Sequence, residues 1–262
     1  MRVFVKASCL SLLAVALLAG SAQARTVNGC VIKAKTSCVG TNLSGKNLRG
    51  VVMHHSVLHH INLRNADLRG ADLRYADLRN ANLRGADLRG ANLKGAKLHY
   101  YSKPREKGAS RQTPSCNPNC YGADLSYTNL SHANLTNATL IDANLSYSTL
   151  INAVLSGANL SFANLSYATL TGALLTSANV SGALLIYATV IEVNLTNASL
   201  NGANLTNAEL TDANLANANL SFGFVTGANL TNANLNGATL NGVVGCSTVT
   251  PSGTLNGMGC YN

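Results

Sequence analysis

The chain has 262 residues, no Trp, four Phe and four Pro, and a formal net charge of +9. Asn, Ala and Leu are so frequent that the composition approaches low complexity. A regular apolar position nevertheless returns through most of the chain, which excludes a disordered protein.

Residues 1–24 have the pattern of a secretory signal peptide. Arg2 and Lys6 precede an apolar run over 9–20, and Ala22-Gln23-Ala24 supplies the small residues that a signal peptidase requires. The apolar run is too short to span a membrane. We therefore expect a mature chain that begins at Arg25, has no membrane-spanning segment, and is periplasmic or secreted.

Residues 43–98 and 123–242 carry a repeat of five residues. Leu, or in a few units Met or Val, occupies the central position, and a small residue, usually Ala, stands two positions earlier. This period matches neither the 3.6 residues of a helix nor the 2 of an ordinary strand. A solenoid buries such a stripe, because each unit needs to stack only on its neighbours.

Units such as ADLRG, ADLRY and ANLTN resemble the pentapeptide-repeat proteins. The resemblance implies an all-β fold, a right-handed quadrilateral β-helix with four pentapeptides per coil and the central Leu and small residue inside. Twelve units in the first block and twenty-four in the second then predict nine coils, in a rod roughly 40 Å long. Both numbers are multiples of four, so we expect residues 99–122 to form a loop insertion rather than a domain boundary.

Six cysteines lie outside the predicted signal peptide, and fifteen pairings are possible. An even number in an exported chain favours disulfides. Their grouping favours Cys30 with Cys38 in an N-terminal cap over 25–42, and Cys246 with Cys260 in a C-terminal cap over 243–262. Cys116 and Cys120 would pair inside the insertion, where the alternative is a zinc site formed by the two thiols.

All nineteen Lys and Arg lie in the first 111 residues. In the first block, basic side chains that follow the central Leu are predicted to point outward on all four faces, and we call them the basic collar. The collar consists of Arg64, Arg69, Arg74, Arg79, Arg84, Arg89 and Lys94. The insertion adds Lys103, Arg105, Lys107 and Arg111. These residues could bind an anionic envelope component or form a solvated, charged surface; nucleic acid is the least expected partner, because the chain is predicted to be exported.

Tyr127, Tyr147, Tyr167 and Tyr187 recur at intervals of twenty residues. With four units per coil, they would stack along one face as a tyrosine ladder. Such a ladder could bind a sugar or a partner protein, or it could only stabilise neighbouring coils.

The first block also contains two histidine pairs, formed by His54, His55, His59 and His60. Imidazoles with this spacing are candidate ligands for Zn, Cu or Ni. The alternative is four surface histidines without a metal.

No catalytic motif is present: the chain lacks GxSxG and phosphate-binding glycine patterns, and its carboxylates are scattered. The sequence therefore predicts a protein that is not an enzyme and has no cofactor. We predict an exported binding or scaffold protein that contacts an envelope component or a partner protein through the collar, the insertion or the tyrosine ladder. The alternatives are a secreted effector and a DNA-mimicking, topoisomerase-binding protein, an activity that the family resemblance implies but that the basic half and the signal peptide disfavour.

Overall fold

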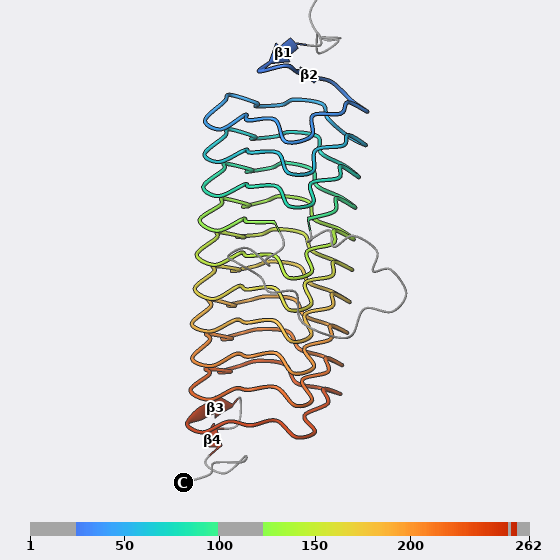
Figure 1. Ribbon diagram of the computed structural model, residues 1–262. Coiled ribbons are helices and arrows are strands. Elements are labelled where there is room, and N and C mark those ends of the chain that lie inside the picture. The colour runs from blue at the N-terminus through green and yellow to red at the C-terminus, as the bar shows by residue number, and fades with distance from the viewer. Residues whose placement is uncertain (1–24, 99–122, 251–252, 256–262) are drawn as a thin grey trace, which may run out of the picture.

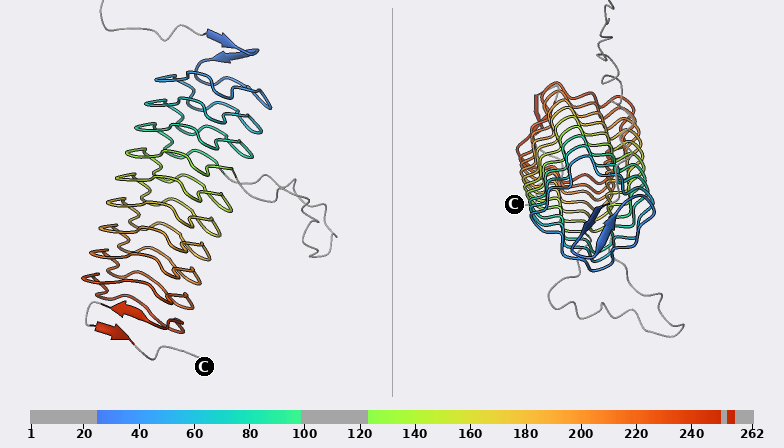
Figure 2. Two further views of the ribbon diagram at one scale, coloured as in Figure 1. Left: turned by 90° about the vertical axis from the view of Figure 1, so that its left-hand side faces the viewer. Right: turned by 90° about the horizontal axis from the view of Figure 1, so that it is seen from above.

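The computed structural model describes residues 25–98, 123–250 and 253–255. In these residues the chain winds into a rod of stacked coils (Figure 1), and successive coils have the same outline when the rod is seen from above (Figure 2). Among the described residues there is no helix, and hence none long and apolar enough to cross a membrane.

Parallel backbone pairing at a spacing of twenty residues builds the coils. The residue before each central position pairs with its counterpart one coil later, as Asn144 does with Asn164. The Leu145 N–H donates to the Asn164 carbonyl at 2.7 Å, and the Asn164 N–H donates to the Ala143 carbonyl at 2.9 Å. Four pentapeptides therefore complete one turn, and the predicted β-helix is confirmed.

The four pentapeptides of a coil form four faces. We name them A, B, C and D after Leu145, Leu150, Leu155 and Leu160, the central residues of one coil, and assign the other pentapeptides to faces by their pairing. Each face ends at a corner, which is occupied by the residue two positions after the central one.

The same stack continues on both sides of residues 99–122. Across this interval the pairing distance changes from twenty to forty-two residues, as in Asn82 with Asp124 and Lys97 with Thr139. The chain leaves the described residues after Leu98, on face D, and returns at Ala123, on face A. The register of the coils is thus unchanged.

The core is a column of large and small side chains. Leu145 and Leu150 are fully buried, and so is Ala143, two positions before Leu145. Because the inward side chains of four pentapeptides converge in a narrow interior, a large residue at one inward position requires a small one at the other. This requirement explains the strict Ala-x-Leu pattern.

A turn closes each pentapeptide and explains two further preferences. The Ser148 N–H donates to the Leu145 carbonyl at 3.1 Å, and Tyr147, the third residue of this turn, has φ of +58°. Gly and Asn adopt positive φ most readily and are frequent at this corner position. The Ser146 N–H donates to Asn144 Oδ1 at 3.2 Å, so Asn or Asp before Leu satisfies a backbone donor in the turn.

Short hairpins flank the coils. At the N-terminal end β1 (Arg25–Val27) pairs antiparallel with β2 (Cys30–Ile32). At the other end β3 (Thr248–Thr250) pairs antiparallel with β4 (Gly253–Leu255). Both hairpins lie at the ends of the rod in Figure 1, where the last coil would otherwise expose unpaired backbone groups.

The predicted disulfide between Cys30 and Cys38 is confirmed. Ser37 pairs with Val57 as other residues before a central position do, so buried Cys38 occupies a central position one unit before Leu43. The sequence pattern did not show this unit, because Cys replaces Leu.

The other cysteine predictions remain open. Cys246 is also disulfide-bonded, but its predicted partner Cys260 lies outside the described residues. Cys116 and Cys120 lie outside them as well, so these two pairings stay predictions.

Truncation of a central leucine should destabilise the rod. For Leu145→Ala we expect a loss of about 2–5 kcal/mol in the free energy of unfolding, because the rigid stack cannot collapse around the cavity. Ser146→Ala, on the surface of the same pentapeptide, should change it by less than about 0.5 kcal/mol. Urea denaturation followed by circular dichroism measures both; equal effects would contradict the packing described here.

Candidate functional site

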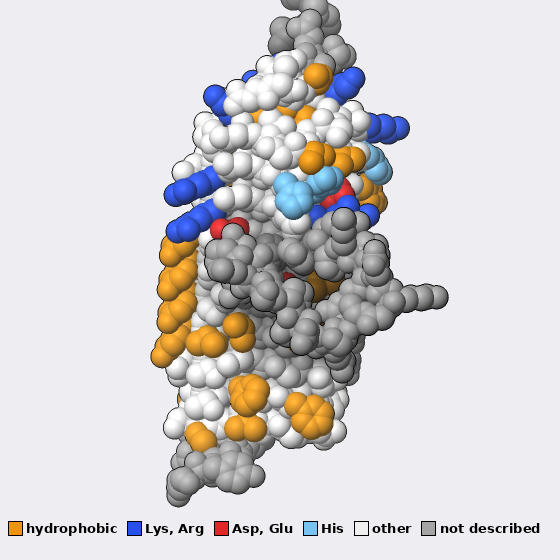
Figure 3. Space-filling model, in the orientation of Figure 1, with side chains coloured by type: hydrophobic (Ala, Val, Ile, Leu, Met, Phe, Trp, Pro, Cys, Tyr) orange, Lys and Arg blue, Asp and Glu red, His pale blue; other side chains and the backbone are white. Residues whose placement is uncertain are grey.

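The structure places every collar residue on the outside of the rod, directly after a central Leu. Arg64 and Arg84 lie on face A, Arg69 and Arg89 on face B, Arg74 and Lys94 on face C, and Arg79 on face D. The predicted distribution over all four faces is therefore confirmed. On the side of the rod that Figure 3 shows, basic side chains are visible only in the N-terminal part.

Four collar arginines are paired with the aspartate two residues earlier. The Nη2 atoms of Arg69, Arg74 and Arg89 lie 2.6, 2.7 and 2.6 Å from Asp67, Asp72 and Asp87, respectively. Arg79 forms the equivalent ion pair with Asp77. These contacts neutralise four of the collar charges locally.

The remaining collar residues follow asparagine instead. Arg64, Arg84 and Lys94 come after an Ala-Asn-Leu or Ile-Asn-Leu segment, and Arg49, one coil before Arg69, follows Asn47. Each backbone N–H donates to the asparagine Oδ1 at 3.1 Å, as it would to an aspartate. No carboxylate of the described residues forms an ion pair with these four side chains, and we call their charges uncompensated for that reason. Arg49 also interacts electrostatically with Asp67, the partner of Arg69.

The paired aspartates are held in the charged form. Hydrogen bonds from Arg69 lower the pKa of Asp67 to about 2, and equivalent bonds lower the pKa of Asp72 and Asp87. Burial raises the pKa of Asp77, but the bonds from Arg79 outweigh it, and the result is a lowered pKa. The pairs therefore persist at neutral pH and well into the acidic range.

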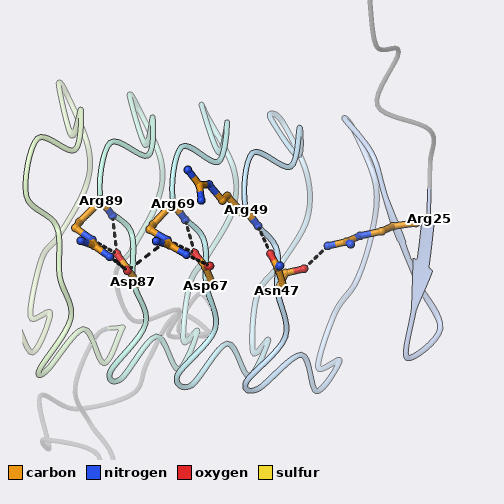
Figure 4. A network of polar contacts seen from close by, with 7 residues as sticks. All are labelled: Arg25, Asn47, Arg49, Asp67, Arg69, Asp87 and Arg89. Atoms are coloured by element: carbon orange, nitrogen blue, oxygen red, sulfur yellow. Dashed lines mark hydrogen bonds and ion pairs between the residues drawn. The ribbon is translucent and has the colours of Figure 1, made fainter.

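Face B carries the longest basic row. Arg49, Arg69 and Arg89 follow one another at the spacing of the coils (Figure 4) and, with Gly70, line a shallow hollow in the surface. Arg69 Nε also lies 3.6 Å from Asp87 Oδ2, which links consecutive coils. Arg25 of β1 extends the row by donating to the Asn47 carbonyl.

The four tyrosines stack as predicted. Their ring centroids are 5.0, 4.8 and 5.2 Å apart in sequence order, with interplanar angles of 2°, 2° and 12°. Arg84 Cζ lies 5.4 Å from the Tyr127 ring centroid, so a guanidinium covers the N-terminal end of the ladder.

Stacking limits what the ladder can bind. Each side chain is about half exposed, but the faces of the inner rings are covered by their neighbours. The ladder presents ring edges and hydroxyl groups to solvent rather than the flat faces on which a sugar would stack. This geometry favours the stabilising role, and a binding role stays a prediction.

The structure divides the four histidines into two pairs. His54 and His55 have ring centroids 5.5 Å apart, and so do His59 and His60. His55 stacks on Tyr75 at 4.9 Å. In the described part of the chain, no group of three or more His, Cys, Asp or Glu side chains is arranged to hold a metal ion.

Lys103, Arg105, Lys107 and Arg111 lie outside the described residues, as does the predicted signal peptide. The sequence reasoning missed two surface features that the structure brings out. Arg49 belongs to the face B row, and Phe162 and Phe222 are 65% and 64% exposed at corners between faces D and A. Comparing residues twenty positions apart would have found both.

A family model described as pentapeptide repeats matches residues 35–70, 66–99, 119–157, 153–186, 191–222 and 208–244, with eight copies. The chain belongs to the pentapeptide-repeat family. Among solved structures it is similar to HetL, a pentapeptide repeat protein involved in heterocyst differentiation regulation from the cyanobacterium Nostoc sp. strain PCC 7120. The identity is 30% over 84% of this chain and 91% of HetL, with a TM-score of 0.59.

Two further pentapeptide-repeat structures match less well in three dimensions. QnrB1, a plasmid-mediated fluoroquinolone resistance protein, is 19% identical over 81% of this chain and 90% of its own, with a TM-score of 0.35. Rfr23 from the cyanobacterium Cyanothece 51142 is 40% identical over 39% of this chain and 63% of its own, with a TM-score of 0.16. No curated protein sequence matched the chain.

Removing one arginine should shift the titration of its partner. In the folded chain Asp67 should titrate near pH 2 and contribute stability that is present above about pH 4 and lost as the pH falls through about 2. Arg69→Gln should return the pKa toward the ordinary aspartate value of about 3.9. NMR titration of the Asp67 carboxyl carbon checks this, and an unchanged midpoint would show that Arg69 does not cause the shift.

The tyrosine ladder should contribute to stability through its inner rings. Tyr147→Ala removes two stacked pairs and should lower the free energy of unfolding by about 1–2 kcal/mol. Tyr187→Ala, at the end of the ladder, removes one pair and should cost about half as much. Denaturation midpoints distinguish the two; a loss that does not depend on position in the ladder would argue against stacking as its cause.

Proposed function

We propose that this pentapeptide-repeat protein is an exported, non-catalytic scaffold that its basic collar holds at an anionic surface of the cell envelope. The observation that best supports this proposal is the set of collar side chains that come two positions after Asn rather than Asp. In the described residues these side chains form no ion pair with a carboxylate. Export is inferred from the signal-like pattern of residues 1–24.

The distribution of charge along the rod supports an oriented attachment. Residues 25–98 contain thirteen Lys and Arg against four Asp, whereas residues 123–250 contain five Asp and Glu and no basic residue. An anionic surface attracts the first block and repels the second. The N-terminal end of the rod would therefore approach the surface first, with the tyrosine ladder directed away from it.

Phosphate-bearing lipid headgroups suit the geometry of the collar. Uncompensated cations lie on adjacent faces, with Arg64 and Arg84 on face A and Arg49 on face B, so more than one side of the rod can approach headgroups. Each such side chain near an anionic leaflet contributes about 1 kcal/mol. Attachment through several of them is reversible and weakens as salt screens the charges.

The alternative function, mimicry of duplex DNA, requires a negatively charged surface. In the described residues the negative charges of the first block are all paired with arginine, and the second block has only five. The surface charge therefore supports attachment to an anion rather than imitation of one.

Exchanging Asn for Asp tests the collar without disturbing the turns. Asn62→Asp with Asn82→Asp keeps the backbone acceptor for Arg64 and Arg84 but gives each arginine a carboxylate partner. We expect binding to phosphatidylglycerol-containing vesicles to weaken by roughly thirtyfold, equivalent to about 2 kcal/mol. Cosedimentation with vesicles at low and moderate salt measures the change.

Two matched variants control this experiment. Asn164→Asp with Asn204→Asp makes the same change in net charge on face A of the second block, at positions that do not pair with an acidic residue, and should leave binding unchanged. Asp72→Asn releases Arg74 from its pair and should strengthen binding. Equal binding to uncharged phosphatidylcholine vesicles, or no effect of the Asn62 and Asn82 substitutions, would show that the collar is a solvated surface with no role in attachment.

A further inference from the structure

Within the described residues, the dipeptide Asn-Gly occurs at Asn28, Asn201, Asn236 and Asn241. Two of these asparagines have the same neighbours, because Asn201 and Asn236 both lie in the tetrapeptide Leu-Asn-Gly-Ala. A difference in chemical behaviour between these two must therefore come from the structure and not from the local sequence.

An Asn-Gly peptide is reactive when its backbone is free to move. The glycine nitrogen can attack the side-chain carbonyl carbon of the asparagine, because glycine has no side chain to obstruct the approach and accepts backbone angles that other residues avoid. The nitrogen must lose its proton and the peptide plane must rotate. A hydrogen bond from the glycine N–H to a carbonyl opposes both changes.

Asn201 lies in a coil that has a neighbour on either side. The Gly202 N–H donates to the Ser221 carbonyl at 2.8 Å, and the Asn201 carbonyl accepts from the Gly182 N–H at 2.9 Å. The peptide between Asn201 and Gly202 is therefore bonded to both neighbouring coils. Asn201 and Gly202 are also half-buried.

The last coil of the rod is open on faces C and D. The chain continues along face B as β3, whose Val249 pairs with Asn229, and then turns back into β4. No described residue pairs with face C or face D of this coil from its C-terminal side. Leu240 on face D is consequently 36% exposed, whereas Leu220, one coil earlier on the same face, is 1% exposed.

Asn236 and Asn241 lie in this open coil, on faces C and D. The carbonyl of each asparagine accepts a hydrogen bond of 2.8 Å from the coil before it. On the other side of each peptide, no described residue accepts a hydrogen bond from the Gly237 or Gly242 N–H. All four residues are exposed. These two peptides are thus held from one side only and rotate more easily than the peptide after Asn201.

We propose that Asn236 and Asn241 are modification sites at which the chain deamidates spontaneously. The Gly237 nitrogen loses its proton and attacks Cγ of Asn236, and the side-chain amide leaves as ammonia. One water molecule then opens the resulting succinimide. Breakage of the bond between nitrogen and Cγ gives aspartate, and breakage of the bond between nitrogen and the backbone carbonyl carbon gives isoaspartate. Asn241 and Gly242 react in the same way, and nothing is oxidised or reduced.

Asn28, in the turn between β1 and β2, differs from the two asparagines of the open coil. Its side-chain amide donates to the Asn42 carbonyl at 2.7 Å. This bond fixes the group that would have to move toward the Gly29 nitrogen. The proposal therefore does not extend to Asn28.

Deamidation changes the charge at one end of the rod. Residues 123–250 contain five acidic and no basic residues, a formal charge of −5, and conversion of both asparagines makes it −7. The new carboxylates lie at the end opposite the basic collar. They therefore increase the charge asymmetry on which the proposed attachment relies, although the modification itself does not depend on that attachment.

Incubation of the purified, folded chain in heavy-oxygen water at mildly alkaline pH tests the proposal, because only new events incorporate the label. No Lys or Arg follows Arg111, so pepsin rather than trypsin must produce the peptides, and its acidic conditions suppress further reaction. Mass spectrometry should find labelled aspartate and isoaspartate at positions 236 and 241, formed at least about tenfold faster than at 201. In the chain unfolded by urea, Asn201 and Asn236 should react at the same rate.

Hydrogen exchange provides a second measurement. The Gly237 and Gly242 amides should exchange without protection, and the Gly202 amide should be protected. As a control, Asn236→Gln with Asn241→Gln should take up almost no label in this coil, because a six-membered ring closes far more slowly than a five-membered one. Equal rates at Asn201 and Asn236 in the folded chain, no reaction at the two open sites, or a protected Gly237 amide would overturn the proposal.

Discussion

Parallel backbone pairing between residues twenty positions apart is the constraint from which the surface of this protein follows. It forces each pentapeptide to place one large and one small side chain inward, as Leu145 and Ala143 do. The outward positions are released from packing and stand in columns at the spacing of the coils, about 4.8 Å. A sequence correlation at a period of twenty thus becomes a row of like groups on one face.

Like charges that follow one another in a column at this spacing would repel, and the residue before Leu decides whether they do. Asp67 and Asn47 accept the same backbone hydrogen bond, so the turn forms equally well with either. Only Asp neutralises the following arginine. The choice between Asp and Asn therefore sets the surface charge of each pentapeptide with little effect on the fold, and the uncompensated charge of the collar is a property separate from stability.

The sequence alone predicted the β-helix, the outward collar and the tyrosine stack, because these depend only on which position of the repeat a residue occupies. It did not predict the unit at Cys38, where another apolar residue replaces Leu.

Assigning functions to faces is physically meaningful in a solenoid, because a side chain on one face contacts mainly the coils before and after it. Face B can therefore carry Arg69 and Glu209 far from one another, because six coil spacings, roughly 30 Å, separate them. At this separation the charges are screened within one rod.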